Sequence, residues 1–351
     1  MKTLLRLLLK TQHQPDRSGV NQTEKGMTLI ELLIGTVMAF LIITPMLGFV
    51  VDMLNTDRRE QVKSNTEQDI QAAVDFIAQD LSQAIYIYDN NGATGIPELI
   101  NKKFIPTETD RTPILVFWKR QQLTKSVPIN STVSAQKPSD CKSKPDECND
   151  YYVLSLVAYY QIREADPKSI WCQPSGNDCP TRIARYEIRD GVKNPSPADP
   201  TKPYYTLDPK EPGSPDEAFN TANFDINKPA ENVTMGRDKF KNPEVLVNYI
   251  DHSPRPAIQN ECTTALGTPT ITTEVTPTLV PETTLRIPAA PPDTVNSFYA
   301  CVDTSRNLAR VTIRGNSLRR LQANDANYNA SKSAFFPTAS VQVQGLGSRG
   351  K

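Results

Sequence analysis

The chain has 351 residues, with 39 Lys and Arg balancing 39 Asp and Glu, so its formal net charge at pH 7 is +0. This balance provides no basic surplus for nucleic-acid binding, and 38% hydrophobic with 22% charged residues is typical of a globular rather than a disordered protein. Only two His are present, which disfavours a His-rich metal site and acid–base chemistry based on His.

An apolar segment runs from Leu29 to Val51, interrupted only by Glu31 and by the uncharged Thr36 and Thr44. As a helix this segment would span about 34 Å, which is enough for roughly 30 Å of bilayer hydrocarbon. A cleaved secretory signal fits poorly, because its apolar run is only about 7–15 residues long. The sequence therefore predicts one membrane-spanning helix over residues 27–54.

Glu31 lies inside this apolar run, where a carboxylate costs free energy. In one interpretation it stays hydrated at the membrane surface and stabilises the positive end of the helix dipole. In the other, it pairs with a positive group inside an assembly, because a paired buried charge is tolerated where an unpaired one is not.

The segment 25–33, with Gly26, Met27 and Glu31 at its key positions, resembles the processing site of type IV pilins and type II secretion pseudopilins. The resemblance implies a prepilin leader over residues 1–26, cleavage by a prepilin peptidase after Gly26, and methylation of the new N-terminus at Met27. It also implies that Glu31 of one subunit pairs with the Met27 amine of a neighbour. Met27 departs from the Phe that is commoner in the family.

Two residues in the membrane part, Pro45 and Gly48, disfavour a regular helix. Pro removes one helical hydrogen bond and clashes with the preceding turn, so a kink or local melting is one interpretation. A Pro tolerated by the membrane helix without a role is the other. Pilin assemblies loosen in this region, so the resemblance favours the first.

Beyond the membrane segment, less polar residues recur at alternating spacings of three and four. This pattern predicts an amphipathic helix over residues 55–88 that packs on a sheet and ends at Asn90-Asn91-Gly92. The predicted contact stripe consists of Thr66, Ile70, Ala73, Ile77, Leu81, Ala84 and Tyr88.

Short apolar runs after residue 88 predict antiparallel strands, and no long helical pattern interrupts them. The predicted fold class is α+β: one long N-terminal helix, half membrane-spanning and half amphipathic, packed on an antiparallel β-sheet head over residues 89–351. The resemblance implies that this fold is pilin-like. The strands are predicted at Ile114–Trp118, Tyr151–Tyr160, Ile183–Ile188, Val245–Tyr249, Phe298–Val302, Ala309–Ile313 and Val341–Val343.

Residues 191–300 contain 17 of the 29 Pro and are predicted to be mostly loops. Within them, residues 263–294 hold eleven Thr, six Pro and no aromatic residue, so little apolar surface offsets the cost of ordering the backbone. A glycosylated stalk is one interpretation of this composition. A long surface loop closed by Cys262 and Cys301 is the simpler one.

The six Cys include no Cys-x-x-Cys pair, which favours disulfides in an oxidising compartment. Their spacing favours three local bridges out of fifteen possible connectivities. A four-Cys zinc site is the alternative, but it lacks the usual spacing of two to four residues. No metal or cofactor is expected. The predicted bridges are Cys141–Cys148, Cys172–Cys179 and Cys262–Cys301.

The common enzyme motifs G-x-S-x-G, H-E-x-x-H and the P-loop are missing from the sequence, so the chain is not expected to be an enzyme. If the mature chain begins at Met27, only His252 could serve a Ser-His-Asp triad. The pair Asp251-His252 lies near Pro residues and is interpreted as a turn.

Two further groups of residues have a structural and a functional interpretation. The segment 89–92, Asp-Asn-Asn-Gly, is predicted to be a turn rather than a calcium loop, since it lacks the downstream Glu of an EF-hand. Four tyrosines could form a sugar-stacking surface, but packing within the strands is the default prediction for aromatics in such runs. They are Tyr151, Tyr152, Tyr159 and Tyr160.

The segment 75–81 resembles the larger minor pseudopilins of the J and W types. The segments 85–89, 113–120 and 335–338 resemble the hormogonium polysaccharide secretion pseudopilins of filamentous cyanobacteria, in particular the C-type member. The resemblance implies a minor pseudopilin in a filament that supports polysaccharide secretion and gliding motility.

The partners expected from this resemblance are a prepilin peptidase, other pseudopilins or pilins, the inner membrane and the exported polysaccharide, with no nucleic acid. The chain would cross the inner membrane once and place its head in the periplasm or on an extracellular pseudopilus. Two other functions stay open: a tip adhesin or polysaccharide receptor, and a membrane-anchored hydrolase that uses His252.

Overall fold

The computed structural model describes residues 26–346, except 130–134, 177, 209, 217–218, 222, 232, 235–240, 254, 257, 274–275, 289–293 and 296. Residues 1–25 of the predicted leader therefore lie outside the described residues. The chain divides into two compact units, Met1–Asp57 and Arg58–Lys351, each of which is described by itself.

Helix α2 (Leu29–Ser82) is one unbroken helix of 54 residues. By length and composition, its apolar part could cross a membrane, as the sequence predicts. Pro45 and Gly48 lie within the helix without interrupting it. The local melting favoured by the resemblance is therefore not present in this structure.

In the second unit, α2 buries one face against the rest of the unit. The hydrophobic stripe predicts this face correctly as far as Leu81, and two residues outside the stripe, Val74 and Asp80, are also buried. Glycine is required where the chain passes this face, because a Cβ on Gly315 would lie 2.9 Å from both the Ile70 Cγ1 and the Thr66 Cγ2 atoms. The buried residues of α2 are Thr66, Ile70, Ala73, Val74, Ile77, Asp80 and Leu81.

The predicted helix over 55–88 is wrong at its C-terminal end. The helix stops at Ser82, and residues Ala84–Tyr88 form strand β1, which pairs with β2. Residues four apart share a face both in a helix and in a strand, so burial of Ala84 and Tyr88 fits either structure. The β-branched and aromatic residues at 85–88 favour the strand.

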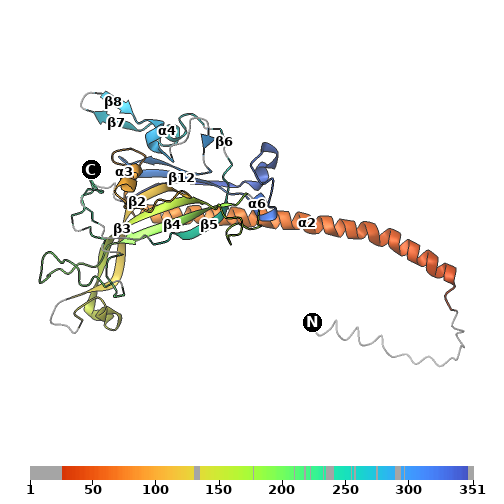
Figure 1. Ribbon diagram of the computed structural model, residues 1–351, viewed down its shortest axis with the longest axis horizontal. Helices are drawn as coiled ribbons and strands as arrows, with labels where there is room; N and C mark the ends of the chain where they lie inside the picture. Colours follow the sequence, from red (N-terminus) through yellow and green to blue (C-terminus); the bar gives the residue numbers. More distant parts are fainter. Residues whose placement is uncertain are drawn as a thin grey trace, which may run out of the picture. The chain divides into compact units, whose positions relative to one another are not determined.

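The first sheet has five strands in the order β1-β2-β3-β4-β5, and each strand is antiparallel to the next one in the chain. Figure 1 shows β2, β3 and β4 as long strands lying side by side. Helix α3 (Ile96–Asn101) lies between β1 and β2 in sequence. The strands after β1 are β2 (Arg111–Pro128), β3 (Cys148–Arg163), β4 (Thr181–Arg189) and β5 (Glu244–Ile250), with short helices η2 (Asp140–Lys142) and η3 (Pro145–Glu147) between β2 and β3.

The second sheet has four antiparallel strands in the order β13-β12-β11-β9. All seven predicted strands fall within longer strands of these two sheets. This confirms the coarse α+β prediction of a long N-terminal helix with antiparallel sheets. The strands are β9 (Arg286–Ile287), β11 (Phe298–Asp303), β12 (Leu308–Arg314) and β13 (Thr338–Gln344), with helices α6 (Leu318–Leu321) and η5 (Ala330–Phe335) before β13.

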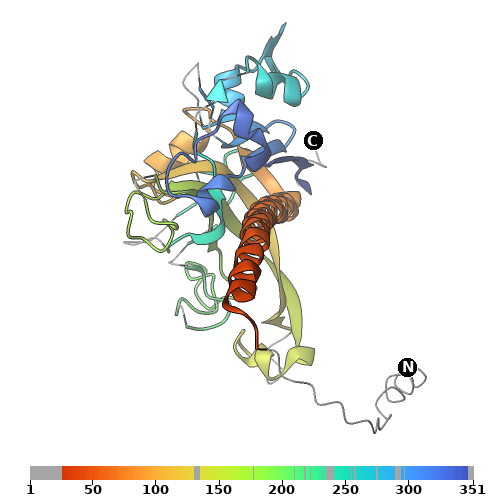
Figure 2. The ribbon, with the colours of Figure 1, turned by 90° about the vertical axis from the view of Figure 1, so that its right-hand side faces the viewer.

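One hydrophobic core joins the buried face of α2 to both sheets. Figure 2 shows the orange C-terminal end of α2 beside the strands of the head. The outer edge of β1 is covered, because the Asn307 and Thr304 side chains donate hydrogen bonds to the carbonyl oxygens of Ala84 and Ile87, both at 2.9 Å. This edge therefore belongs to the interior of the second unit.

The predicted long loop over residues 263–294 is wrong in part. Strands β7 (Thr270–Thr273) and β8 (Thr276–Leu279) form a hairpin, and β9 joins the second sheet. Thr is frequent in strands. The Thr-rich composition of this segment lowers its hydrophobicity but still permits β-structure. The other short elements here are β6 (Arg255–Pro256), α4 (Glu261–Ala265), α5 (Glu282–Leu285) and β10 (Thr294–Val295), of which β6 and β10 pair with each other.

Candidate functional site

The predicted cleavage site lies just before α2 in exposed, non-helical backbone. Gly26 and Met27 are both exposed, and Met27 is 75% exposed. A peptidase binds its substrate as an extended segment. The Gly26–Met27 bond is exposed and lies outside the helix, so it is accessible to such an enzyme.

Glu31 caps the N-terminus of α2 through hydrogen bonds to Thr28 of the same chain. The Glu31 Oε2 atom accepts hydrogen bonds from the Thr28 backbone N–H at 3.4 Å and from the Thr28 hydroxyl at 3.3 Å. The Glu31 N–H in turn donates to the Thr28 Oγ1 atom at 3.4 Å. This reciprocal arrangement is a capping box, which satisfies N–H groups that the helix leaves unpaired. A pattern of Thr followed three residues later by Glu signals it in the sequence.

The first half of α2 presents an apolar surface on all sides. Every described residue from 26 to 57 is exposed, and the large apolar side chains from Met27 to Leu54 are between 49% and 85% exposed. A soluble monomer rarely exposes a contiguous apolar patch of this length, so such a surface indicates lipid or other protein chains as its surroundings.

The six cysteines form three disulfides, which are the pairs predicted from their spacing: Cys141–Cys148, Cys172–Cys179 and Cys262–Cys301. The first two each close a short turn. The third links α4 to β11 in the second sheet. All three belong to the second unit, so the crosslinks stabilise the part of the chain that carries the sheets.

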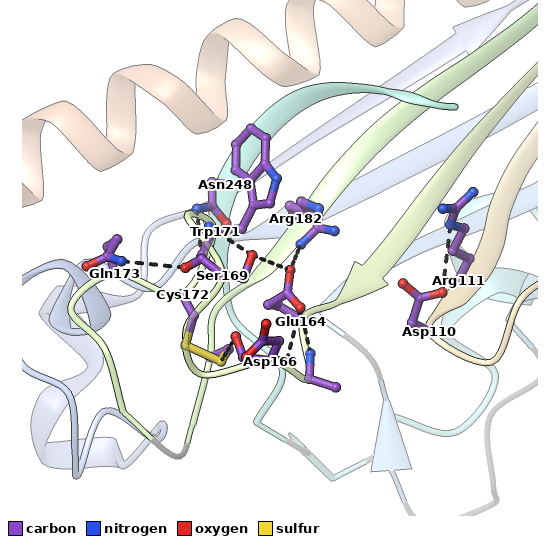
Figure 3. Close-up of polar contacts among 12 residues, drawn as sticks. Asp110, Arg111, Glu164, Asp166, Ser169, Trp171, Cys172, Gln173, Arg182 and Asn248 are labelled. Atoms are coloured by element: carbon purple, nitrogen blue, oxygen red, sulfur yellow. Dashed lines mark hydrogen bonds and ion pairs between the residues drawn. A yellow bond between two sulfur atoms is a disulfide. The ribbon is translucent and has the colours of Figure 1, made fainter. Parts of the chain in front are cut away.

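The turn of the second disulfide is attached to the first sheet by a half-buried carboxylate. Figure 3 shows Glu164 between Arg182 and Ser169, with the Arg182 Nη1 and Ser169 Oγ atoms both 2.9 Å from the Glu164 Oε2 atom. Burial alone would raise the pKa of Glu164, but hydrogen bonds from the Asp166 backbone, Ser169 and Arg182 outweigh it and hold this pKa below its usual value. The arrangement positions the loop that follows β3.

A buried carboxylate, Asp80, joins α2 to the first sheet. Its Oδ1 atom is 2.9 Å from the Lys119 Nζ atom, and its Oδ2 atom is 2.8 Å from the Arg185 Nε atom. The Tyr159 hydroxyl donates to the same Oδ2 atom at 2.7 Å. Glu187 completes the group by contacting both cations, at 3.3 Å and 2.7 Å. This cluster fixes the position of α2 along β2, β3 and β4.

The charge state of Asp80 follows from this geometry. Burial would raise the pKa of Asp80, but the hydrogen bond and charge of Arg185, together with Lys119, lower it below its usual value. Asp80 is therefore ionised although it is only 6% exposed. The hydrophobic pattern does not predict this group, because an isolated Asp beside Leu81 gives no sign of partners far away in sequence.

His252, the one His within the described residues, pairs with Asp178, since its Nε2 atom lies 2.8 Å from the Asp178 Oδ1 atom. The neighbouring Ser253 hydroxyl donates instead to the Asp251 Oδ1 atom at 2.7 Å. Asp251 is fully buried and also binds Arg314, with 2.8 Å between the Arg314 Nε and Asp251 Oδ2 atoms. The structure therefore does not bring Ser253, His252 and Asp251 together as a triad.

The four predicted tyrosines do not form one surface. Tyr159 and Tyr160 are buried in the core, and Tyr151 is half-buried. Only Tyr152 is exposed, with the Arg120 guanidinium 4.2 Å from its ring centre. Packing within the strand therefore accounts for two of the four, and a shared sugar-stacking surface is excluded.

The predicted turn at residues 89–92 is confirmed. The Asp89 side chain accepts the Asn91 N–H at 3.0 Å, and the Asn91 side chain accepts the Ala93 N–H at 2.9 Å. These short-range bonds are typical of Asx turns. The turn follows β1 and does not end a helix as the sequence predicts.

No group of three or more His, Cys, Asp or Glu in the described part of the chain could hold a metal ion. Comparison of the chain with family models, with curated proteins and with solved structures gives no match. The functional argument therefore depends on the N-terminal segment and on the surface of the second unit.

Proposed function

We propose that the chain is a minor pseudopilin, a structural subunit of a filament of the type IV pilus or type II secretion kind that supports polysaccharide secretion and gliding motility. One observation carries the proposal: an exposed Gly26–Met27 bond stands four residues before Glu31, at the start of a helix whose first, apolar half is exposed on all sides. One segment thus combines the features that a peptidase substrate, a register-setting charge and a packing surface would need.

The proposed mechanism is assembly, without catalysis and without a cofactor. A prepilin peptidase removes residues 1–26, and the helix is held in the inner membrane, with the disulfide-linked head in the periplasm or on an extracellular pseudopilus. In the filament, apolar helices of neighbouring pilins and pseudopilins replace lipid around α2. Glu31 then pairs with the Met27 amine of a neighbour, since an unpaired carboxylate would be costly there.

The first prediction concerns the mature N-terminus. Protein purified from its own membranes is expected to begin at Met27 and to carry one added methyl group, as measured by intact mass and N-terminal peptide mass spectrometry. A Gly26→Val variant, which blocks the proposed cleavage, should retain Met1. Wild-type protein that retains its first 26 residues would contradict the proposal.

The second prediction concerns Glu31. The Glu31→Ala variant should be processed and inserted normally but should enter the sheared filament fraction about tenfold less, which corresponds to about 1.4 kcal/mol of lost pairing. Quantitative immunoblots of filament and membrane fractions measure this ratio. Glu67→Ala is the matched control, because Glu67 is an exposed residue of the same helix. Equal incorporation of both variants would contradict the role given to Glu31.

A further inference from the structure

A polar groove lies in the second unit, between the turn of the Cys172–Cys179 disulfide and the segment that follows α6. Its volume is about 640 Å³, within the range of about 300–1,000 Å³ typical of ligand sites. Arg163 at the end of β3, Asp178 in the disulfide turn and His252 after β5 line it together with Asn324, Asn327 and Tyr328 of the segment after α6.

The lining of the groove is unusual for a small-molecule site, because the described residues that line it include no aliphatic side chain. Most ligand pockets are mainly apolar with a few polar groups. Here amide, carboxylate, imidazole and guanidinium groups surround one aromatic ring. A polar lining of this kind disfavours lipids and apolar peptides, and it suits a ligand that offers many hydroxyl groups.

The aromatic ring is fixed in place by its surroundings. Tyr328 is 39% exposed, and its backbone N–H donates to the Ser253 Oγ atom at 2.9 Å. The Phe336 ring packs edge-on at 5.2 Å between centres, and the Arg314 guanidinium lies 4.6 Å from the ring centre. The ring is thus ordered before any ligand arrives, which lowers the entropy cost of binding.

A buried arginine connects the disulfide turn to the segment that follows α6, both of which line the groove. Arg319 is 1% exposed, and its Nε atom donates to the Asp178 carbonyl oxygen while its Nη1 atom donates to the Gln322 carbonyl oxygen at 3.2 Å. The Asn316 side chain holds the same segment by donating to the Ala326 carbonyl oxygen at 2.7 Å. These two buried side chains, Arg319 and Asn316, therefore fix the segment after α6 relative to the disulfide turn.

Three exposed polar side chains of the groove, Arg163, Asn324 and Asn327, have no side-chain hydrogen-bond partner among the described residues. The two carboxylates are already paired, Asp178 with His252 and Asp325 with Lys332 at 2.6 Å. The formal charges around the groove therefore nearly cancel. This near balance disfavours a polyanion or a polycation as the ligand.

We propose that this groove binds a neutral segment of a polysaccharide. One face of a sugar ring stacks on Tyr328, while Asn324, Asn327 and Arg163 form hydrogen bonds with hydroxyl groups, for which an amide supplies both a donor and an acceptor. The choice of a saccharide rests on the proposed function in polysaccharide secretion. The groove would let the head contact the polymer during its export.

The test is isothermal titration calorimetry of the full chain in detergent with maltohexaose, cellohexaose and mannohexaose, and with hexagalacturonate as an acidic probe. Saturable binding of at least one neutral hexamer is expected. Tyr328→Ala and Asn327→Ala should each weaken that binding about tenfold. Tyr152→Ala should leave it within about twofold, because Tyr152 is an exposed tyrosine outside the groove.

Circular dichroism melting of each variant separates lost binding from lost folding, and Asn327 is exposed enough for its variant to remain folded. The proposal is overturned by lack of saturable binding to all three neutral hexamers, by binding of the acidic hexamer alone, or by unchanged affinity in the folded Asn327→Ala protein. N-terminal processing is measured independently. If the chain is cleaved after Gly26 but binds no glycan, the glycan-binding proposal is overturned and the pseudopilin proposal stands.

Discussion

Replacement of Asp80 by Ala is expected to lower the free energy of unfolding by about 3–5 kcal/mol, the largest effect of any single substitution considered for this chain. The variant would leave Lys119 and Arg185 largely buried, with Glu187 as their only remaining carboxylate partner in the cluster. Uncompensated charge in a low-dielectric interior is costly, whereas the intact cluster is balanced. Loss of the carboxylate therefore acts on two cations at once.

Chemical denaturation of the full chain in detergent, followed by tryptophan fluorescence, measures this effect. Trp118 is buried in the same unit and reports its unfolding. Asp75→Ala is the matched control, since Asp75 is an exposed acid on the same helix, and its loss should cost less than about 0.5 kcal/mol. Similar losses for the two variants would show that the cluster does not stabilise the packing of α2.

The same carboxylate predicts a pH dependence. The pKa of Asp80 in the folded state lies below its usual value of 3.8, so the unfolded state binds a proton more readily than the folded state. The stabilisation is therefore fully present above the usual pKa and is lost as the pH falls through the folded value. Wild-type protein should lose stability on acidification below about pH 4 more steeply than Asp80→Ala.

Removal of the Cys262–Cys301 disulfide by a double Ser substitution is expected to cost about 4 kcal/mol. The bridge joins cysteines 39 residues apart, and the entropy that it removes from the unfolded chain grows with the length of the closed loop. The segment inside contains little apolar surface to hold it otherwise. Urea unfolding of the variant and the wild type measures the difference.

The Cys141–Cys148 bridge is the matched control, because its cysteines are only 7 residues apart. The same chain-entropy relation gives about 2.5 kcal/mol for the corresponding double Ser variant. If the short-loop variant lost as much stability as the long-loop variant, or more, loop length would not be the main cause of the stabilisation.

Local patterns in the sequence predict much of the fold. The seven strands are visible because each is a short apolar run, and the disulfide pairs follow from simple spacing. The end of α2 is missed because the interval between Ala84 and Tyr88 fits a helix and a strand equally. The hairpin at Thr270–Leu279 is missed because each of its strands has only 4 residues, with Ile271 and Leu279 as their large apolar residues.

The residues with proposed functions likewise include some that the sequence identifies and some that it does not. The proposed processing and assembly residues Gly26, Met27 and Glu31 lie in one short segment, so the sequence alone is enough to propose them. The groove brings together Asp178, His252 and the loop at Asn324–Tyr328, which lie far apart along the chain. Only tertiary packing creates that juxtaposition, and the irregular, polar loop around residue 325 gives no periodic signal.

In the proposed filament, the capping box at Thr28 and Glu31 would influence when a subunit changes partners. Cleavage after Gly26 would leave both residues in the mature chain, so the carboxylate of a lone subunit could stay hydrogen-bonded to Thr28 of its own chain. The Met27 amine of a neighbouring subunit would then have to compete with Thr28 for the Glu31 carboxylate. Such competition would keep the carboxylate hydrogen-bonded within a single subunit in the bilayer, and pairing between subunits would be favoured only where several amines lie close together.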